Sequence, residues 1–159
     1  MARFWVGLGS NLANPCRQLE EARRALATRF HELAAASLYE SRPWGYVHQP
    51  NFLNMVIGYD GAESPQAILE FLLAQENRQG RRRTIANGPR SLDLDLLHCE
   101  GQSSSTSDLM LPHPRLGQRA FVIVPWAEIA PTLILPDDPR PLAQRARDFS
   151  SEECWLLED

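Results

Sequence analysis

The 159-residue sequence contains no lysine, and all 16 of its basic residues are arginine. Its net charge is −4, so the chain lacks the positive excess of a general nucleic-acid-binding protein. Cysteine is scarce as well: Cys16, Cys99 and Cys154 are far apart and form no CxxC pair. This spacing disfavours a zinc site or a redox centre and favours three free thiols.

Long hydrophobic runs are also absent. The longest, such as residues 121–126, fall far short of the roughly 20 residues that a membrane-spanning helix needs. No secretory signal pattern is visible at the N-terminus, so we expect a cytoplasmic protein that does not bind membranes. The phosphate-binding patterns GxxxxGK[ST] and GxGxxG are missing too, which disfavours the common nucleotide-binding folds.

What is present is the composition of an ordinary globular protein. The hydrophobic share is 43%, and the length suits one hydrophobic core. Because we find no internal repeat and no domain boundary, we expect a single domain over residues 1–159.

The predicted elements indicate an α+β fold. Two helices begin where a capping residue precedes a proline, at Asn14-Pro15 and Ser64-Pro65, and Gly80 ends the second helix. Four segments have strand patterns: residues 3–9, 33–40, 52–59 and 92–99. The order is strand, helix, strand, strand, helix, strand, which predicts a ferredoxin-like βαββαβ core with an antiparallel sheet and helices on one face.

The C-terminal part adds to this core. The segments predicted there are a polar loop at 101–108, a helix at 119–129, a turn-rich connection at 136–141 and an edge strand at 154–157. A basic loop is expected at residues 81–90.

The sharpest chemical pattern is Leu92-Asp-Leu-Asp-Leu96. Side chains of a strand alternate between faces, so the three leucines should point into the core while Asp93 and Asp95 point together to the other side. At strand rise their Cα atoms are about 6.5 to 7 Å apart. Two carboxylates this close suit Mg²⁺ and a phosphoryl group, although a half-exposed strand with two solvated acids would show the same spacing.

Arginines cluster just before this strand, at residues 81–83 and at Arg90. A magnesium–triphosphate site needs such cations to neutralise charge on the transferred group. A solvated basic loop, or simple pairing of the arginines with the two aspartates, is the alternative.

Two further patterns suggest binding of a flat heterocycle and of phosphate. Phe52 and Asn54 share one strand face, so a ring could stack on the heterocycle while an amide reads its edge; a core phenylalanine beside a turn-capping asparagine would look alike. His113 lies between two prolines on constrained backbone. It could contact phosphate, act as a general acid, or be a hydrogen-bonded structural residue.

Short motifs follow one another in order from Val6 to Pro131. They are Gly7-Leu-Gly-Ser-Asn-Leu12; Ser37-Leu-Tyr-Glu-Ser41 with Pro43 and Gly45; Gln49-Pro-Asn-Phe-Leu-Asn54; Glu76 with Gly80-Arg81 and Arg83; Gly88-Pro-Arg90 with Leu92-Asp-Leu-Asp95; Pro112-His-Pro114 with Arg119 and Phe121; and Glu128-Ile-Ala-Pro131. Together they resemble the 6-hydroxymethyl-7,8-dihydropterin pyrophosphokinase family.

The resemblance implies a ferredoxin-like fold and the reaction of ATP with hydroxymethyldihydropterin to give AMP and the pterin diphosphate, in folate biosynthesis. At the pterin, it implies that Phe52 and Phe121 sandwich the ring, that Asn54 binds its edge, and that the pocket is lined by Ser41, Arg42 and Trp44. It also implies a monomer whose partners are small-molecule substrates.

At the phosphates, the resemblance implies that Asp93 and Asp95 hold two Mg²⁺ ions. Contacts with the triphosphate are implied for Arg81, Arg90, His113 and Arg119, and Arg83 would help close the arginine loop. The nucleotide pocket would be lined by Glu76, Leu96, Leu109 and Met110.

The chain departs from the family pattern mainly in that loop, which is about one residue shorter and has Asn87 where a tryptophan is often found. Two other readings stay open: a non-catalytic pterin- or nucleotide-binding homologue, and an unrelated structural module of ferredoxin-like fold.

Overall fold

The computed structural model describes residues 2–12, 14–43, 48–80, 91–101, 104–105, 110–111 and 119–157. Its main sheet has six strands: β1 (Ala2–Ser10), β2 (His31–Ala35), β3 (Tyr39–Ser41), β4 (Phe52–Gly61), β5 (Asp93–Cys99) and β8 (Cys154–Leu156). The helices are α1 (Pro15–Ala27), α2 (Pro65–Arg78), α3 (Ala120–Ile129) and α4 (Leu142–Arg145), followed by a 3₁₀ turn at Ala146–Asp148. A small separate sheet pairs β6 (Ser104–Ser105) with β7 (Met110–Leu111).

The main sheet has the order β5-β1-β4-β3-β8, and β2 pairs with the other half of β4. Every strand pair in it is antiparallel. With α1 after β1 and α2 after β4, this is the βαββαβ arrangement, and the predicted α+β class with a ferredoxin-like core is confirmed.

The two core helices begin as the sequence predicts. The side chain of Asn14 accepts a hydrogen bond from the Arg17 amide, and the side chain of Ser64 accepts one from Ala67. In both helices a proline occupies the first turn, where its missing N–H would have had no partner inside the helix.

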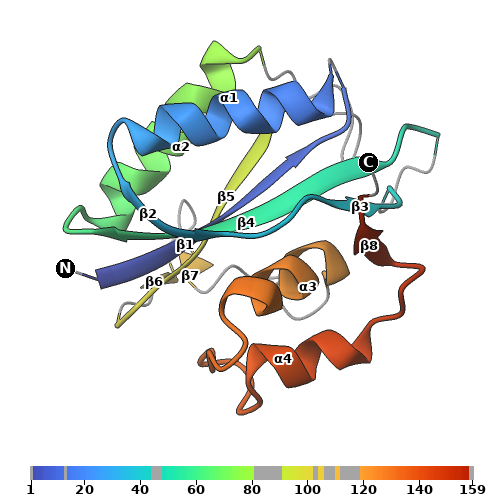
Figure 1. Cartoon of the computed structure of the whole chain (residues 1–159). Coiled ribbons are helices and arrows are strands. Elements are labelled where there is room, and N and C mark those ends of the chain that lie inside the picture. Colours follow the sequence, from blue (N-terminus) through green and yellow to red (C-terminus); the bar gives the residue numbers. More distant parts are fainter. Residues whose placement is uncertain are drawn as a thin grey trace.

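Helices cover both faces of the sheet rather than one (Figure 1). On one face α1 and α2 bury a core that includes Leu19, Leu26, Ile68 and Leu72. On the other face α3 and α4 pack Ile123, Trp126 and Leu142 against Trp5, Val56 and Leu97 of the sheet. Each such aliphatic side chain contributes about 1.5 to 3 kcal/mol when fully buried, so both layers stabilise the fold.

Two predictions of secondary structure were wrong. The single strand expected at 33–40 is two strands, because β2 pairs with Ile57–Asp60 of β4 whereas β3 pairs with Phe52–Asn54. The segment 101–108 is not all loop, since it contributes β6.

The C-terminal additions are held by charge as well as by packing. Arg145, only 3% exposed, donates two hydrogen bonds of 3.1 Å to Asp137. Arg140 contacts both Asp138 and Asp148 at 2.9 Å. Within the described ranges, no helix has the length and apolar character needed to cross a membrane.

Candidate active site

Strand β5 turns two different faces to its two neighbouring layers. Leu92, Leu94 and Leu96 are buried in the core beneath α1 and α2. Asp93 and Asp95 are half-buried and line a pocket on the α3 side. The alternation expected from the Asp-Leu-Asp pattern is therefore confirmed, and both carboxylates face one space.

Glycines form the floor of this pocket. Gly9 of β1 lies directly between Asp93 of β5 and Asn54 of β4, and Gly7 lies beside Asp95. A Cβ atom at Gly9 would contact Asn54 Oδ1 at 3.4 Å, so a side chain larger than alanine there would project into the pocket. The two glycines at alternate positions keep one face of β1 open.

Asn54 and Ser41 form a buried polar pair on the far side of this floor. They are 3% and 2% exposed, and Asn54 Nδ2 donates to Ser41 Oγ at 2.8 Å. The pairing of β3 with β4 brings them together, because Ser41 is in register with Phe52, two residues before Asn54. The hydrogen bond fixes the orientation of the amide that faces the pocket.

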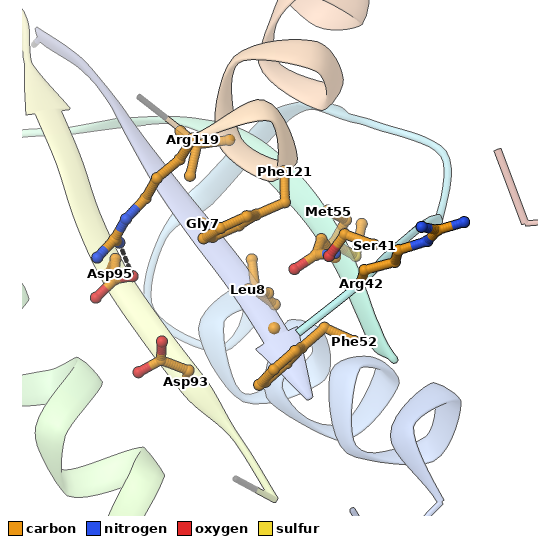
Figure 2. A pocket seen from close by; sticks show the side chains of 13 residues that line it. Gly7, Leu8, Ser41, Arg42, Phe52, Met55, Asp93, Asp95, Arg119 and Phe121 are labelled. Carbon is orange, nitrogen blue, oxygen red and sulfur yellow. Dashed lines mark hydrogen bonds and ion pairs between the residues drawn. The ribbon is translucent and has the colours of Figure 1, made fainter. Parts of the chain in front are cut away.

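Two phenyl rings flank the same space. Phe52 rises from the start of β4, and Phe121 extends from the first turn of α3 on the opposite side (Figure 2). Arg42 also lines the pocket, but its guanidinium points away from the cavity in the same view. Two facing rings with an amide at their edge are suited to a flat heterocycle that carries hydrogen-bonding groups.

Arg119 lies at the acidic end, immediately before α3. Its Nη1 is 3.9 Å from Asp95 Oδ2, and its Cζ is 5.5 Å from the centre of the Phe121 ring. Its Nε is buried and has no hydrogen-bond partner among the described residues. A guanidinium in this position offers further donors to an anionic ligand.

The pocket as a whole contains about 650 Å³ of space that no atom fills, part of it open to solvent. Its lining residues are Gly7, Leu8, Gly9, Ser41, Arg42, Phe52, Asn54, Met55, Asp93, Asp95, Arg119, Phe121 and Val122. The two rings and Ser41, the partner of the Asn54 amide, lie on one side, and the carboxylates with Arg119 lie on the other (Figure 2). The arrangement can therefore bind a flat ring beside a charged group.

The structure brings eight residues predicted from the sequence into this pocket: Ser41, Arg42, Phe52, Asn54, Asp93, Asp95, Arg119 and Phe121. Two others lie elsewhere. Leu96 is buried in the core, and Glu76 is buried on α2, where its Oε2 accepts a hydrogen bond of 2.7 Å from the Leu94 amide. Neither lines the pocket.

The remaining predicted residues lie outside the described ranges: Trp44, Arg81, Arg83, Arg90, Leu109 and His113. Met110 is described only through its backbone, which pairs with Ser105. The floor residues Gly7 and Gly9 were part of a motif to which no role was given. Their alternate spacing on a strand was the signal that could have identified an open face.

Comparisons with known proteins find similar sequences over most of the chain. Residues 5–131 match the family described as 7,8-dihydro-6-hydroxymethylpterin-pyrophosphokinase. The chain is 42% identical over 139 residues to a 2-amino-4-hydroxy-6-hydroxymethyldihydropteridine pyrophosphokinase of Pseudomonas aeruginosa, covering 85% of each chain. It is 39% identical over 137 residues to the protein of the same name from Methylorubrum extorquens, covering 85% of this chain and 87% of that one.

A solved structure shares the fold. A crystal structure of an HPPK-DHPS protein in complex with substrates aligns with a TM-score of 0.74 at 12% sequence identity. The alignment covers 92% of this chain and 43% of that longer chain. At this identity the likeness establishes the fold alone.

Proposed function

The chain belongs to the 7,8-dihydro-6-hydroxymethylpterin-pyrophosphokinase family, and we propose that its pocket transfers a pyrophosphoryl group from ATP to 6-hydroxymethyl-7,8-dihydropterin. The products are AMP and the pterin diphosphate, an intermediate of folate biosynthesis. One observation carries the assignment: a slot between two rings, with a buried amide at its edge, opens directly onto a pair of carboxylates and an arginine. We propose that one domain over residues 1–159 performs this reaction.

At the ring end, Phe52 and Phe121 would hold the pterin between their faces. Asn54 would hydrogen-bond the pterin edge, with its orientation fixed by the 2.8 Å bond to Ser41. A pterin edge presents both donors and acceptors, which an amide can match with its two different atoms. Ser41, Arg42 and Trp44 would line the same end, partly through their backbone groups.

At the acidic end, the carboxylates fit magnesium. Mg²⁺ prefers hard oxygen ligands and is commonly held by one or two carboxylates together with substrate phosphates. Asp93 and Asp95 supply two carboxylates on one strand face, and we propose that they hold the two ions that the family resemblance implies. Bound magnesium supplies positive charge that offsets the negative charge of the triphosphate.

The arginines would complete the phosphate site. Arg119 is in place beside Asp95, with donors available to a phosphate oxygen. By their positions in the motifs, we propose that Arg81, Arg90 and His113 also contact the triphosphate and that Arg83 helps to close the loop over it. Glu76, Leu96, Leu109 and Met110 stay predicted neighbours of the nucleotide from motif position alone.

The reaction then needs mainly orientation and charge. The hydroxymethyl oxygen of the pterin attacks the β-phosphorus of ATP, a new P–O bond forms, and the bond to the α-phosphate oxygen breaks to release AMP. The hydroxyl proton leaves to solvent or to a phosphate oxygen. The residues of the slot hold the attacking oxygen in line, and the arginines stabilise charge that develops on the leaving α-phosphate.

An assay of AMP release tests this function. The protein is mixed with ATP, Mg²⁺ and the reduced pterin, and AMP is followed with and without the pterin. Release of AMP that requires the pterin supports the proposal. Tight binding of pterin and nucleotide without AMP release would instead establish the alternative, a non-catalytic homologue.

A further inference from the structure

Helix α3 lies against the face of the sheet that carries the pocket (Figure 1). Polar contacts hold the helix near both ends. At its start, Arg119 lies 3.9 Å from Asp95 of β5. Near its end, Glu128 reaches β3 and the residues before it. The two contacts are nine residues apart, which is about 13 Å along a helix, and Phe121 projects from the helix between them.

Glu128 receives hydrogen bonds from three donors. Its Oε1 accepts from the Tyr39 hydroxyl at 2.7 Å. Its Oε2 accepts from the Ser37 amide at 3.0 Å and from the Ser37 hydroxyl at 3.2 Å. Burial, together with the neighbouring Glu128 carboxylate, raises the pKa of Tyr39 well above its usual range, so the phenol keeps its proton and remains a donor.

The position of this carboxylate is unfavourable for the helix itself. Glu128 is the second-last residue of α3, where the negative end of the helix dipole repels an acid. Hydrogen bonds from three donors offset that cost. Glu128 therefore does not stabilise the helix itself; its role is to hold α3 against Ser37 and Tyr39.

Tyr39 and Ser41 belong to the same three-residue strand, and both adjoin the pterin edge site. Tyr39 is 8% exposed and pairs directly with Asn54. Ser41 accepts the hydrogen bond that orients the Asn54 amide. Glu128 thus connects the helix that carries Phe121 to the strand that orients Asn54.

From this connection we infer that Glu128 and Tyr39 are positioning residues for the pterin: their contact sets the place of Phe121 relative to Phe52 and Asn54. The inference rests on the proposed pterin-binding function. Stacking on both faces of one ring depends steeply on the spacing of the two walls, because dispersion contacts weaken within less than 1 Å of separation. A small shift of the Glu128 end of α3 would widen the slot, while the contact between Arg119 and Asp95 holds the start of the helix at the acidic end.

The test compares three variants: Tyr39→Phe, which removes only the hydroxyl; Glu128→Ala, which removes the acceptor; and Glu128→Gln, which keeps an acceptor oxygen. Calorimetry measures binding of 6-hydroxymethylpterin and, separately, of a non-hydrolysable ATP analogue with Mg²⁺. We expect pterin affinity to fall roughly 5- to 20-fold in Tyr39→Phe and Glu128→Ala and nucleotide affinity to change by less than about 2-fold. Glu128→Gln should retain most of the pterin affinity.

Glu63→Gln is the matched control. It weakens another carboxylate contact of the fold, the Arg29–Glu63 pair, which takes no part in the pocket, and should change neither affinity. If Glu128→Ala does not fold, the pterin affinity of Tyr39→Phe alone tests the inference, because this substitution leaves the packing of the aromatic ring nearly unchanged.

The outcomes separate the two proposals. Wild-type pterin affinity in Tyr39→Phe and Glu128→Ala, with an active wild type, would overturn the positioning role alone. An equal loss of both affinities would mean that the contact is merely structural and would also overturn it. A wild type that binds no pterin would overturn the positioning role together with the proposed function.

Discussion

The two faces of the central sheet use the same strands for opposite purposes. Beneath α1 and α2, a closed apolar core includes Leu94 and Leu96 of β5 and Leu92 just before that strand. On the α3 side, Asp93 and Asp95 of the same strand line an open pocket with Arg119. Packing closes the first face completely, whereas the second face leaves charge and space uncovered at the pocket.

The difference shows how one strand can supply both rigidity and chemistry. The buried leucines fix the backbone of β5, and Glu76 adds a hydrogen bond to the Leu94 amide between the two aspartates. The carboxylates therefore project from a rigid element, which favours a well-defined site. Substitutions on the two faces should consequently separate activity from stability.

The largest effect is expected for Asp95→Asn, which keeps the shape of the side chain and removes its charge. Pyrophosphokinase turnover should fall by roughly 10³-fold, because the acidic end loses a proposed magnesium ligand and the charge that faces Arg119. The free energy of unfolding should hardly change, since the side chain is half-buried and closes no core. Steady-state AMP release and urea unfolding measure the two quantities.

Asp60→Asn provides the control, because it alters a carboxylate of β4 that lies outside the pocket. That variant should keep wild-type turnover. Turnover near wild type in Asp95→Asn as well would end the assignment of the acidic pair to metal and phosphate.

One residue further along β5, Leu96→Ala should lower stability and leave turnover unchanged, the opposite of the effect expected for Asp95→Asn. Leu96 is 3% exposed in the core, so the cavity left by truncation should lower the free energy of unfolding by about 2 to 5 kcal/mol. Turnover per folded molecule should stay close to wild type. Should the variant lose ATP affinity while keeping its stability, Leu96 would belong to the nucleotide pocket, as its motif position suggests, rather than to the core.

Asn54→Ala should have an intermediate effect that is confined to the ring end of the pocket. Pterin binding should weaken by about 1 to 3 kcal/mol, because the variant lacks the amide that we propose binds the edge of the pterin ring. Nucleotide affinity should not move. The control is Asn51→Ala, which removes an exposed amide that contacts Glu40 instead of the pocket; an equal loss of nucleotide and pterin affinity in Asn54→Ala would show a structural role.

Much of this division between faces was predictable from the sequence. The Asn14-Pro15 and Ser64-Pro65 signals place the helix starts, and the Asp-Leu-Asp alternation assigns each residue of β5 to a face. Both are local patterns, in which a residue's neighbours in the chain decide its structure.

What could not be predicted depends on partners far away in the chain. No proline or glycine marks the break between β2 and β3, which exists because the two strands pair with different parts of β4. The contact between Tyr39 and Glu128 joins residues 89 positions apart, so no spacing rule reveals it. The same holds for Glu76, whose burial against Leu94 follows from the packing of α2 on β5.

The smallest expected effect is on the pH dependence of stability, through a histidine in the packed part of the α3 face. His98 is 6% exposed, stacks on Trp5 at 6.1 Å, and has no hydrogen-bond partner for Nδ1 among the described residues. Burial lowers its pKa, opposed by Glu100 and Asp137, so the native state favours the neutral ring. In the unfolded chain the His98 imidazole binds a proton near the ordinary histidine pKa of about 6.5. The contribution of His98 to the free energy of unfolding is therefore fully present above about pH 6.5 and is lost as the pH falls below that value.

Urea unfolding at about pH 7.5 and about pH 5.5 measures this contribution. Wild type should lose more stability between the two than His98→Gln, which cannot titrate. Identical losses in the two proteins would show that the buried imidazole does not contribute to the pH dependence.

Identification of the products by ³¹P NMR tests whether the pocket on the α3 face of the sheet catalyses pyrophosphoryl transfer. Wild-type protein, ATP, Mg²⁺ and 6-hydroxymethyl-7,8-dihydropterin are followed to completion beside the Asp95→Asn variant. Pyrophosphoryl transfer at this face requires that wild type forms AMP and a pterin diphosphate in equal amounts and that the variant leaves ATP intact over the same time. Formation of ADP with a pterin monophosphate, or unchanged ATP with active-site residues intact, would contradict it.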